Sequence, residues 1–195
     1  MGISGILLAL FLSLHLAINL TSLISREAYE TAWRFMNDNV LTQIIIPILV
    51  LGVLVHIVFG IITTIRNTKN FKAVKKENDN GIVFKNMLSL GVIVIGLLVL
   101  HLSQFWAKVH LDGENPYDIA KTLFYNGFYV AVYVIWIIAL YFHLSRGFWN
   151  MFQFINTKKS KLISRLQIAS KVFSTIIAAG FILIPVYFYL GLGYV

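Results

Sequence analysis

The sequence predicts an all-α fold, an integral membrane bundle of five transmembrane helices. Of the 195 residues, 58% are hydrophobic and only 12% are charged, and the mean hydropathy is +0.80. A water-soluble globule of this size cannot bury so large an apolar share. Five apolar stretches also reach the roughly 20 residues that a helix needs to cross a ~30 Å hydrocarbon core. The low glycine and proline content and the lack of alternating polarity argue against a membrane barrel.

We expect the helices to be a single transmembrane domain over residues 1–195. They cover approximately 3–24, 41–65, 82–107, 122–149 and 168–193. The first stretch has no basic segment before it and no small-residue cleavage site in a suitable place, which favours a retained helix over a signal peptide. The chain has no cysteine. This excludes disulfides, thiolate metal sites, iron–sulfur ligation and covalent haem attachment.

The charged loops predict the orientation. Twelve of the sixteen basic residues lie between the second and third or the fourth and fifth stretches: Arg66, Lys69, Lys72, Lys75, Lys76, Lys85, Arg146, Lys158, Lys159, Lys161, Arg165 and Lys171. The positive-inside rule then places the N-terminus inside and the C-terminus outside. The same loops account for the net charge of +8 without a nucleic-acid partner, and they suggest some affinity for anionic lipid or an acidic partner.

The first two helices enclose a polar linker. The first carries His15 somewhat past its middle, and residues 21–39 are polar with aromatic residues, as expected of a segment at the outer interface. The second helix returns inward with Pro47, which predicts a kink, and with His56 in its inner half.

A short, turn-rich loop, VHLDGENPYD, joins the third helix to the fourth. The third carries His101 near its outer end, and the fourth carries His143 close to its inner end. The fifth contains Pro185 but no histidine, so we expect it to close the bundle by packing.

Four of the five histidines therefore lie in apolar stretches. An imidazole at such a position is costly without a partner and marks a functional site by default. Depth estimated from helical rise pairs His15 with His101 and His56 with His143, in two layers ~10–20 Å apart. His110 lies in the outer loop, where we expect it to be solvated.

A weak internal repeat supports the same pairing. The first and third helices share LHL followed by an amide side chain, and the second and fourth share H-x-x-x-G, ending at Gly60 and Gly147. Two hairpins of similar design would place equivalent helices opposite one another. A glycine four residues after a histidine lies on the same helix face and makes room there for a flat ring or a close helix.

Two layers of paired imidazoles favour two haems with bis-histidine ligation. A hydrogen-bonded packing histidine or a proton path explains a single case more easily than four matched ones. Zinc is disfavoured because it takes three or four ligands at one depth. Two alternatives stay open: another di-haem membrane cytochrome, such as the gamma-type anchor of nitrate reductases, and a haem-free transporter whose histidines relay protons.

The motifs resemble one known family over nearly the whole chain. They are GISGIL and HLAINL in the first helix, EAYETAWRFM after it, HIVFGIITTIRN in the second, LHLSQFW in the third, and YFHLSRGFWNMFQ and PVYFYLG in the last two. With them the sequence resembles the five-helix, two-haem cytochrome b anchor subunit of succinate:quinone oxidoreductases (succinate dehydrogenases) and quinol:fumarate reductases.

The resemblance implies two haem b groups, with the outer iron on His15 and His101 and the inner iron on His56 and His143. It implies a subunit of the bacterial inner (cytoplasmic) membrane that carries electrons between an iron–sulfur subunit and menaquinone, with a flavoprotein as the dicarboxylate-binding partner. The basic inner loops would then dock the soluble subunits at the cytoplasmic face. The resemblance also allows a dimer of such complexes.

Quinone reduction takes up protons, and the membrane stretches contain no Asp or Glu to supply them. Glu27, Glu30 and Asp38 are outer candidates, although a solvated surface role is the simpler interpretation. Arg66, Arg146, Lys108 and Gln104 are candidates for contact with haem propionates, with ordinary interfacial anchoring as the favoured interpretation.

Overall fold

The computed structural model describes residues 2–73, 80–151 and 160–194, and these residues form helices without a strand, which confirms the all-α class. In chain order the elements are α1 (Gly2–Leu20), the 3₁₀ turn η1 (Thr21–Leu23), α2 (Arg26–Asn37), α3 (Val40–Ala73), α4 (Asn80–His101), the π-helical turn η2 (Leu102–Ala107), α5 (Lys108–Leu111), α6 (Pro116–Tyr125), α7 (Gly127–Met151), α8 (Ser160–Tyr189) and the 3₁₀ turn η4 (Leu192–Tyr194).

Five segments of the described chain are long and apolar enough to cross a membrane. They are Gly2–Leu23, Val40–Thr63, Ser89–Leu111, Gly127–Gly147 and Ser164–Tyr189. By length and composition the chain is therefore a multi-pass membrane protein, as predicted. Its orientation relative to the two membrane faces stays a prediction.

The fourth spanning helix begins later than the sequence suggested, at Gly127 rather than residue 122. The helical conformation is interrupted at Asn126, whose backbone is extended. Its Oδ1 accepts a hydrogen bond of 2.9 Å from the Phe128 N–H. This amide caps the start of α7 and separates it from α6. The segment before Asn126 forms a separate short helix, α6, where the sequence suggested a loop. The Asn115 side chain caps the start of α6 in the same way.

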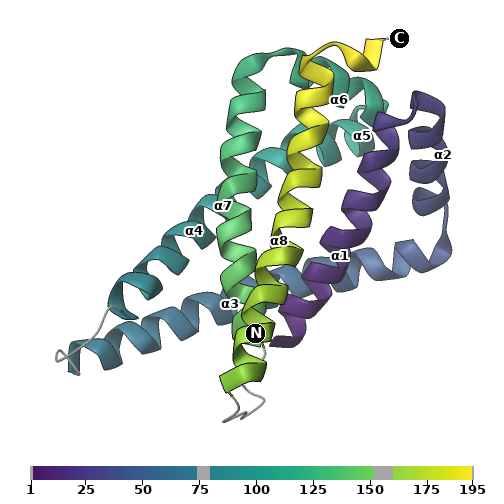
Figure 1. The fold of residues 1–195 in the computed structure, drawn as a ribbon. Coiled ribbons are helices and arrows are strands. Elements are labelled where there is room, and N and C mark those ends of the chain that lie inside the picture. Colours follow the sequence, from purple (N-terminus) through teal and green to yellow (C-terminus); the bar gives the residue numbers. More distant parts are fainter. Residues whose placement is uncertain (1, 74–79, 152–159, 195) are drawn as a thin grey trace.

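The outer linker also forms a helix, α2. Ser25 has an extended backbone, and its Oγ accepts a hydrogen bond of 3.0 Å from the Ala28 N–H. Glu27 in the first turn and Arg34 in the last turn complement the helix dipole. The helix lies beside α1 (Figure 1), so the segment is packed against the bundle.

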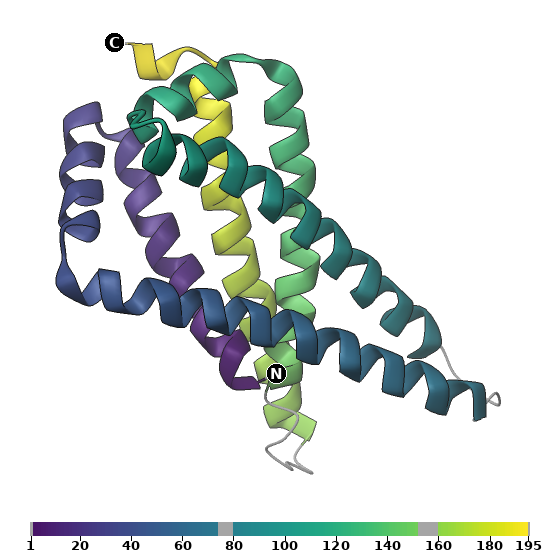
Figure 2. The same cartoon turned by 180° about the vertical axis from the view of Figure 1, so that it is seen from behind.

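Helices α1, α8 and α7 run side by side, and α3 and α4 lie across one face of this group (Figure 2). Both views place the start of α1 and the end of the chain at opposite ends of the bundle. Helix α7 ends and α8 begins at the end where α1 starts (Figure 1). The cross-layer contacts of α1 with α3 and of α4 with α7 bring the four histidine-bearing helices together.

Small side chains allow the helices to approach closely. The Ser170 hydroxyl of α8 donates to the Ser145 carbonyl of α7, and both Ser170 and Ser174 are fully buried. A Cβ on Gly180 of α8 would lie 2.8 Å from Leu16 Cδ2 of α1. Leu16 also belongs to the main cluster of buried apolar residues. This cluster contains Leu16, Tyr29, Tyr117, Phe124, Tyr133, Ile177, Ile184 and Phe188.

Candidate metal centres

The first histidine pair joins α1 to α4. The ring centres of His15 and His101 are 5.9 Å apart, and their planes are inclined by 82°. Both side chains are half-buried, and His101 is the last residue of α4 before the π-helical turn. Single π-helical turns inside helices are frequent at functional sites. The pair thus lies at a local departure from regular helix geometry.

Aromatic side chains surround this pair, which we call the outer pair after the predicted orientation. Phe11 stacks on His15 at 5.3 Å between ring centres, and Phe181 of α8 lies 5.7 Å from the same ring. Phe105 and Trp136 lie 5.1 and 5.4 Å from the His101 ring. These rings form an apolar wall on the sides of the imidazoles that they contact.

A polar contact borders the same pair. The Tyr133 hydroxyl of α7 donates a hydrogen bond of 2.8 Å to Gln104 Oε1 in the π-helical turn, and the Tyr133 ring lies 6.2 Å from His101. The bond links α7 to the segment that follows His101 and satisfies two polar groups inside the bundle. Gln104 Oε1 therefore has a partner within the protein.

The second pair, which we call the inner pair after the predicted orientation, joins α3 to α7. The ring centres of His56 and His143 are 6.3 Å apart, with planes inclined by 73°. Ser4 Oγ of α1 lies 3.3 Å from His56 Nδ1. A Cβ on Gly91 of α4 would lie 3.9 Å from His143 Cε1, whereas a Cβ on Gly147 would have no neighbour within 4 Å among the described residues. The last observation agrees with the expectation that Gly147 leaves room on the face of α7 that carries His143.

The distance between the two pairs follows from residue spacing along α1 and α4. Ser4, at the inner pair, and His15 are eleven residues apart on α1, which corresponds to about 16 Å along the helix axis. Gly91, beside His143, and His101 are ten residues apart on α4, or about 15 Å. The structure therefore brings together the partners that depth pairs in the sequence, at the separation estimated there.

The spacing within each pair fits a shared metal ion. Two opposed imidazoles bound to one ion through bonds of about 2 Å have ring centres about 6 Å apart. His101 Nδ1, His143 Nδ1 and Trp136 Nε1 are buried and have no hydrogen-bond partner among the described residues. Unpartnered buried polar atoms are costly, so the described residues alone leave these three groups with an uncompensated penalty.

The number of ligands distinguishes the kind of centre. Within residues 2–73, 80–151 and 160–194, no group of three or more His, Cys, Asp or Glu side chains could hold a metal ion. Structural zinc needs four protein ligands and catalytic zinc three, whereas axial ligation of haem iron needs one or two. Each pair has the donor set for the two axial positions of a haem.

The acidic candidates lie outside the pairs. Glu30 accepts hydrogen bonds from Arg26 Nε and Asn115 Nδ2, both at 2.8 Å, and the Arg26 bond lowers its pKa. Arg26 also binds both carboxylate oxygens of Asp118 on α6, at 2.9 and 2.7 Å. These contacts tie α2 to α6. Asp38 accepts from the neighbouring Asn37 amide at 3.1 Å.

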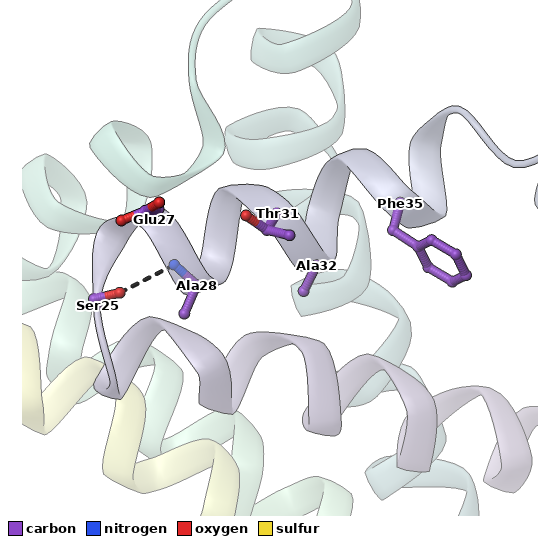
Figure 3. A pocket seen from close by; sticks show the side chains of 6 residues that line it. All are labelled: Ser25, Glu27, Ala28, Thr31, Ala32 and Phe35. Carbon is purple, nitrogen blue, oxygen red and sulfur yellow. Dashed lines mark hydrogen bonds between the residues drawn. The ribbon is translucent and has the colours of Figure 1, made fainter.

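Glu27 lines a shallow groove along α2 (Figure 3). Ser25, Ala28, Thr31, Ala32 and Phe35 complete its lining, and none of these residues is a metal ligand. The groove therefore differs in chemistry from the two histidine pairs.

The remaining candidates also have ordinary surroundings. Lys108 forms an ion pair of 3.4 Å with Glu114, and Arg66 is exposed on α3. Arg146 is half-buried on α7, three residues after His143. His110 is exposed and stacks on Trp106 at 4.9 Å between ring centres, outside both pairs. The side chains of Lys72, Lys75 and Lys76, in the predicted docking loop, lie outside the described part of the chain.

Sequence reasoning missed several residues around the pairs. Ser4 is a small polar residue in an apolar stretch, and its spacing from His15 is three helical turns, but nothing in the sequence shows that it meets His56. Tyr133, Trp136 and Phe181 look like ordinary packing residues until the helices are assembled.

Comparison of the chain with known protein families, with curated proteins and with solved structures gave no match.

Proposed function

We propose that this chain is a cytochrome b that holds two haem b groups and serves as the membrane-anchoring subunit of a succinate dehydrogenase or fumarate reductase. The observation that carries the haem assignment is the pairing of four intramembrane histidines, with ring centres 5.9 Å apart in one pair and 6.3 Å in the other. The motif resemblance carries the assignment to this class of complex.

The histidines would hold the groups from opposite sides. His15 and His101 would hold the outer haem iron, and His56 and His143 would hold the inner one. Each bound haem supplies a centre that gains and loses one electron. The aromatic wall of Phe11, together with the neighbouring rings, keeps water from the outer pair.

Two centres at different depths define a route for electrons. The pairs are about 16 Å apart along α1, so a charge moved between them crosses part of the membrane potential. A full crossing changes its free energy by ~2.3 kcal/mol per 100 mV. Transfer between the pairs is therefore coupled to the membrane voltage.

The complex supplies the chemistry at either end of this route. A flavoprotein would interconvert succinate and fumarate, and an iron–sulfur subunit would exchange electrons with the inner haem. Menaquinone would exchange electrons and protons near the outer haem. The basic loops would dock the soluble subunits on the cytoplasmic face of a bacterial inner membrane, with the N-terminus on that side.

Single histidine substitutions test the haem assignment. His15→Ala and His101→Ala should each remove the same b-type absorption component, while His56→Ala and His143→Ala remove the other, measured in reduced-minus-oxidised spectra of the purified complex. His110→Ala is the matched control, because this histidine lies outside both pairs, and it should leave both components intact. Spectra unchanged by all four pair substitutions would refute the proposal.

A further inference from the structure

We propose that Ser4 is a positioning residue for the inner haem, acting through its hydrogen bond to His56. This inference rests on the proposed function and extends it to a residue that does not itself bind iron. Ser4 Oγ lies 3.3 Å from His56 Nδ1, within hydrogen-bond reach, so the contact links α1 to α3.

The chemistry of a metal-bound imidazole assigns a role to this contact. When one ring nitrogen binds a metal, the other carries a proton and donates it to a nearby acceptor, which fixes the tautomer and the ring orientation and raises ligand basicity. The Ser4 hydroxyl is such an acceptor for Nδ1–H, and it leaves Nε2 of His56 as the ring nitrogen available to bind iron. Ser4 thus orients the ligand and increases its donor strength.

The surroundings of Ser4 support a role in orienting His56. The side chain is 9% exposed and is one of the few buried polar groups among the described residues. Close packing of α1 on α3 holds it there, because a Cβ on Gly52 of α3 would lie 2.8 Å from Leu7 Cδ2. The hydroxyl is therefore fixed beside the ring by the helix contact.

The opposing ligand of the inner pair lacks such support. Nδ1 of His143 is buried and has no hydrogen-bond partner in the described part of the chain. The two imidazoles of the pair are therefore unequal, and within the described residues the orientation of the inner pair depends on the His56 side. Removal of the Ser4 hydroxyl should accordingly affect the inner haem and leave the outer one unchanged.

The test is Ser4→Ala in the intact complex, with haem content and the midpoint potential of each haem measured by spectroelectrochemical titration. Loss of a comparable supporting contact typically weakens metal binding about 10- to 100-fold. A weaker donor also favours ferrous over ferric iron. A tenfold loss of affinity for ferric haem, with the affinity for ferrous haem unchanged, would therefore raise the inner midpoint potential by about 59 mV.

Two further variants make the result specific. Ser4→Thr keeps the hydroxyl and should restore the inner potential. Ser13→Ala removes another α1 hydroxyl, one that donates to the Ala9 carbonyl at 2.9 Å, and should leave both haems as in the parent protein. An inner potential and haem content unchanged in Ser4→Ala would overturn the role of Ser4, as would an equal effect on both haems. A parent protein without haem would instead refute the proposed function.

Discussion

The contact between α1 and α8 beside the outer pair gives a quantitative prediction. A Cβ on Gly180 would lie 2.8 and 2.9 Å from the two Cδ atoms of Leu16 and 3.3 Å from its Cγ. Leu16 is only 6% exposed, so neighbouring atoms restrict its retreat. The flanking residues, His15 on α1 and Phe181 on α8, have ring centres 5.7 Å apart. Gly180→Ala should therefore force the helices apart at the outer histidine pair.

Two effects of opposite sign determine the size of the change. Overpacking of a buried contact costs about 1–3 kcal/mol. Replacing glycine with alanine inside a helix contributes up to about 1 kcal/mol in the other direction. Gly96→Ala on α4 isolates the second effect, because a Cβ there meets no atom within 4 Å. We expect Gly180→Ala to be less stable than Gly96→Ala by about 1–3 kcal/mol, or about 2–12 °C in melting temperature for a chain of this length.

Thermal unfolding of both variants in the same detergent measures this difference. A double-mutant cycle with Leu16→Ala adds a second test, because Gly180→Ala should cost less once the leucine is shortened. A melting temperature of Gly180→Ala at or above that of Gly96→Ala would refute the packing argument.

Two further predictions concern polar contacts. Tyr133→Phe removes the donor to Gln104 Oε1 and should destabilise the protein by about 1–3 kcal/mol. Thermal unfolding measures this loss, and an unchanged melting temperature would contradict it. The link between α2 and α6 should weaken in acid. Because the folded pKa of Glu30 is lowered by Arg26, its contribution is fully present above the ordinary pKa of about 4.3 and is lost as the pH falls through the folded value. Glu30→Gln should reduce this acid dependence of the melting temperature, and an identical pH profile would count against it.

The five spanning helices were predictable because their cause is local. A long apolar stretch in lipid must satisfy its own backbone polar groups, and only a helix does so. The pairing of the histidines was also accessible, since a fixed rise of ~1.5 Å per residue converts sequence position into depth. His15 with His101 and His56 with His143 followed from that conversion alone.

The short helices α2 and α6 were not predicted because their N-cap residues were not taken into account. Composition led us to expect a polar linker and a turn-rich loop, whereas Ser25 and Asn115 are N-caps that start α2 and α6. Cap residues satisfy the first free N–H groups of a helix, so they are a signal that could have been used.

The contacts between helices could not be predicted. The meeting of Ser4 with His56, and of Gly180 with Leu16, depends on the rotation and crossing of whole helices. Those are set by the packing of many side chains at once rather than by any local pattern.

The central claim is that opposed imidazoles at two depths each hold a haem. Quantification of non-covalent haem b per polypeptide in the purified complex tests it most directly. The paired histidines predict two haems per chain, both low-spin with two nitrogen ligands. A preparation with intact helices and no haem would contradict the claim.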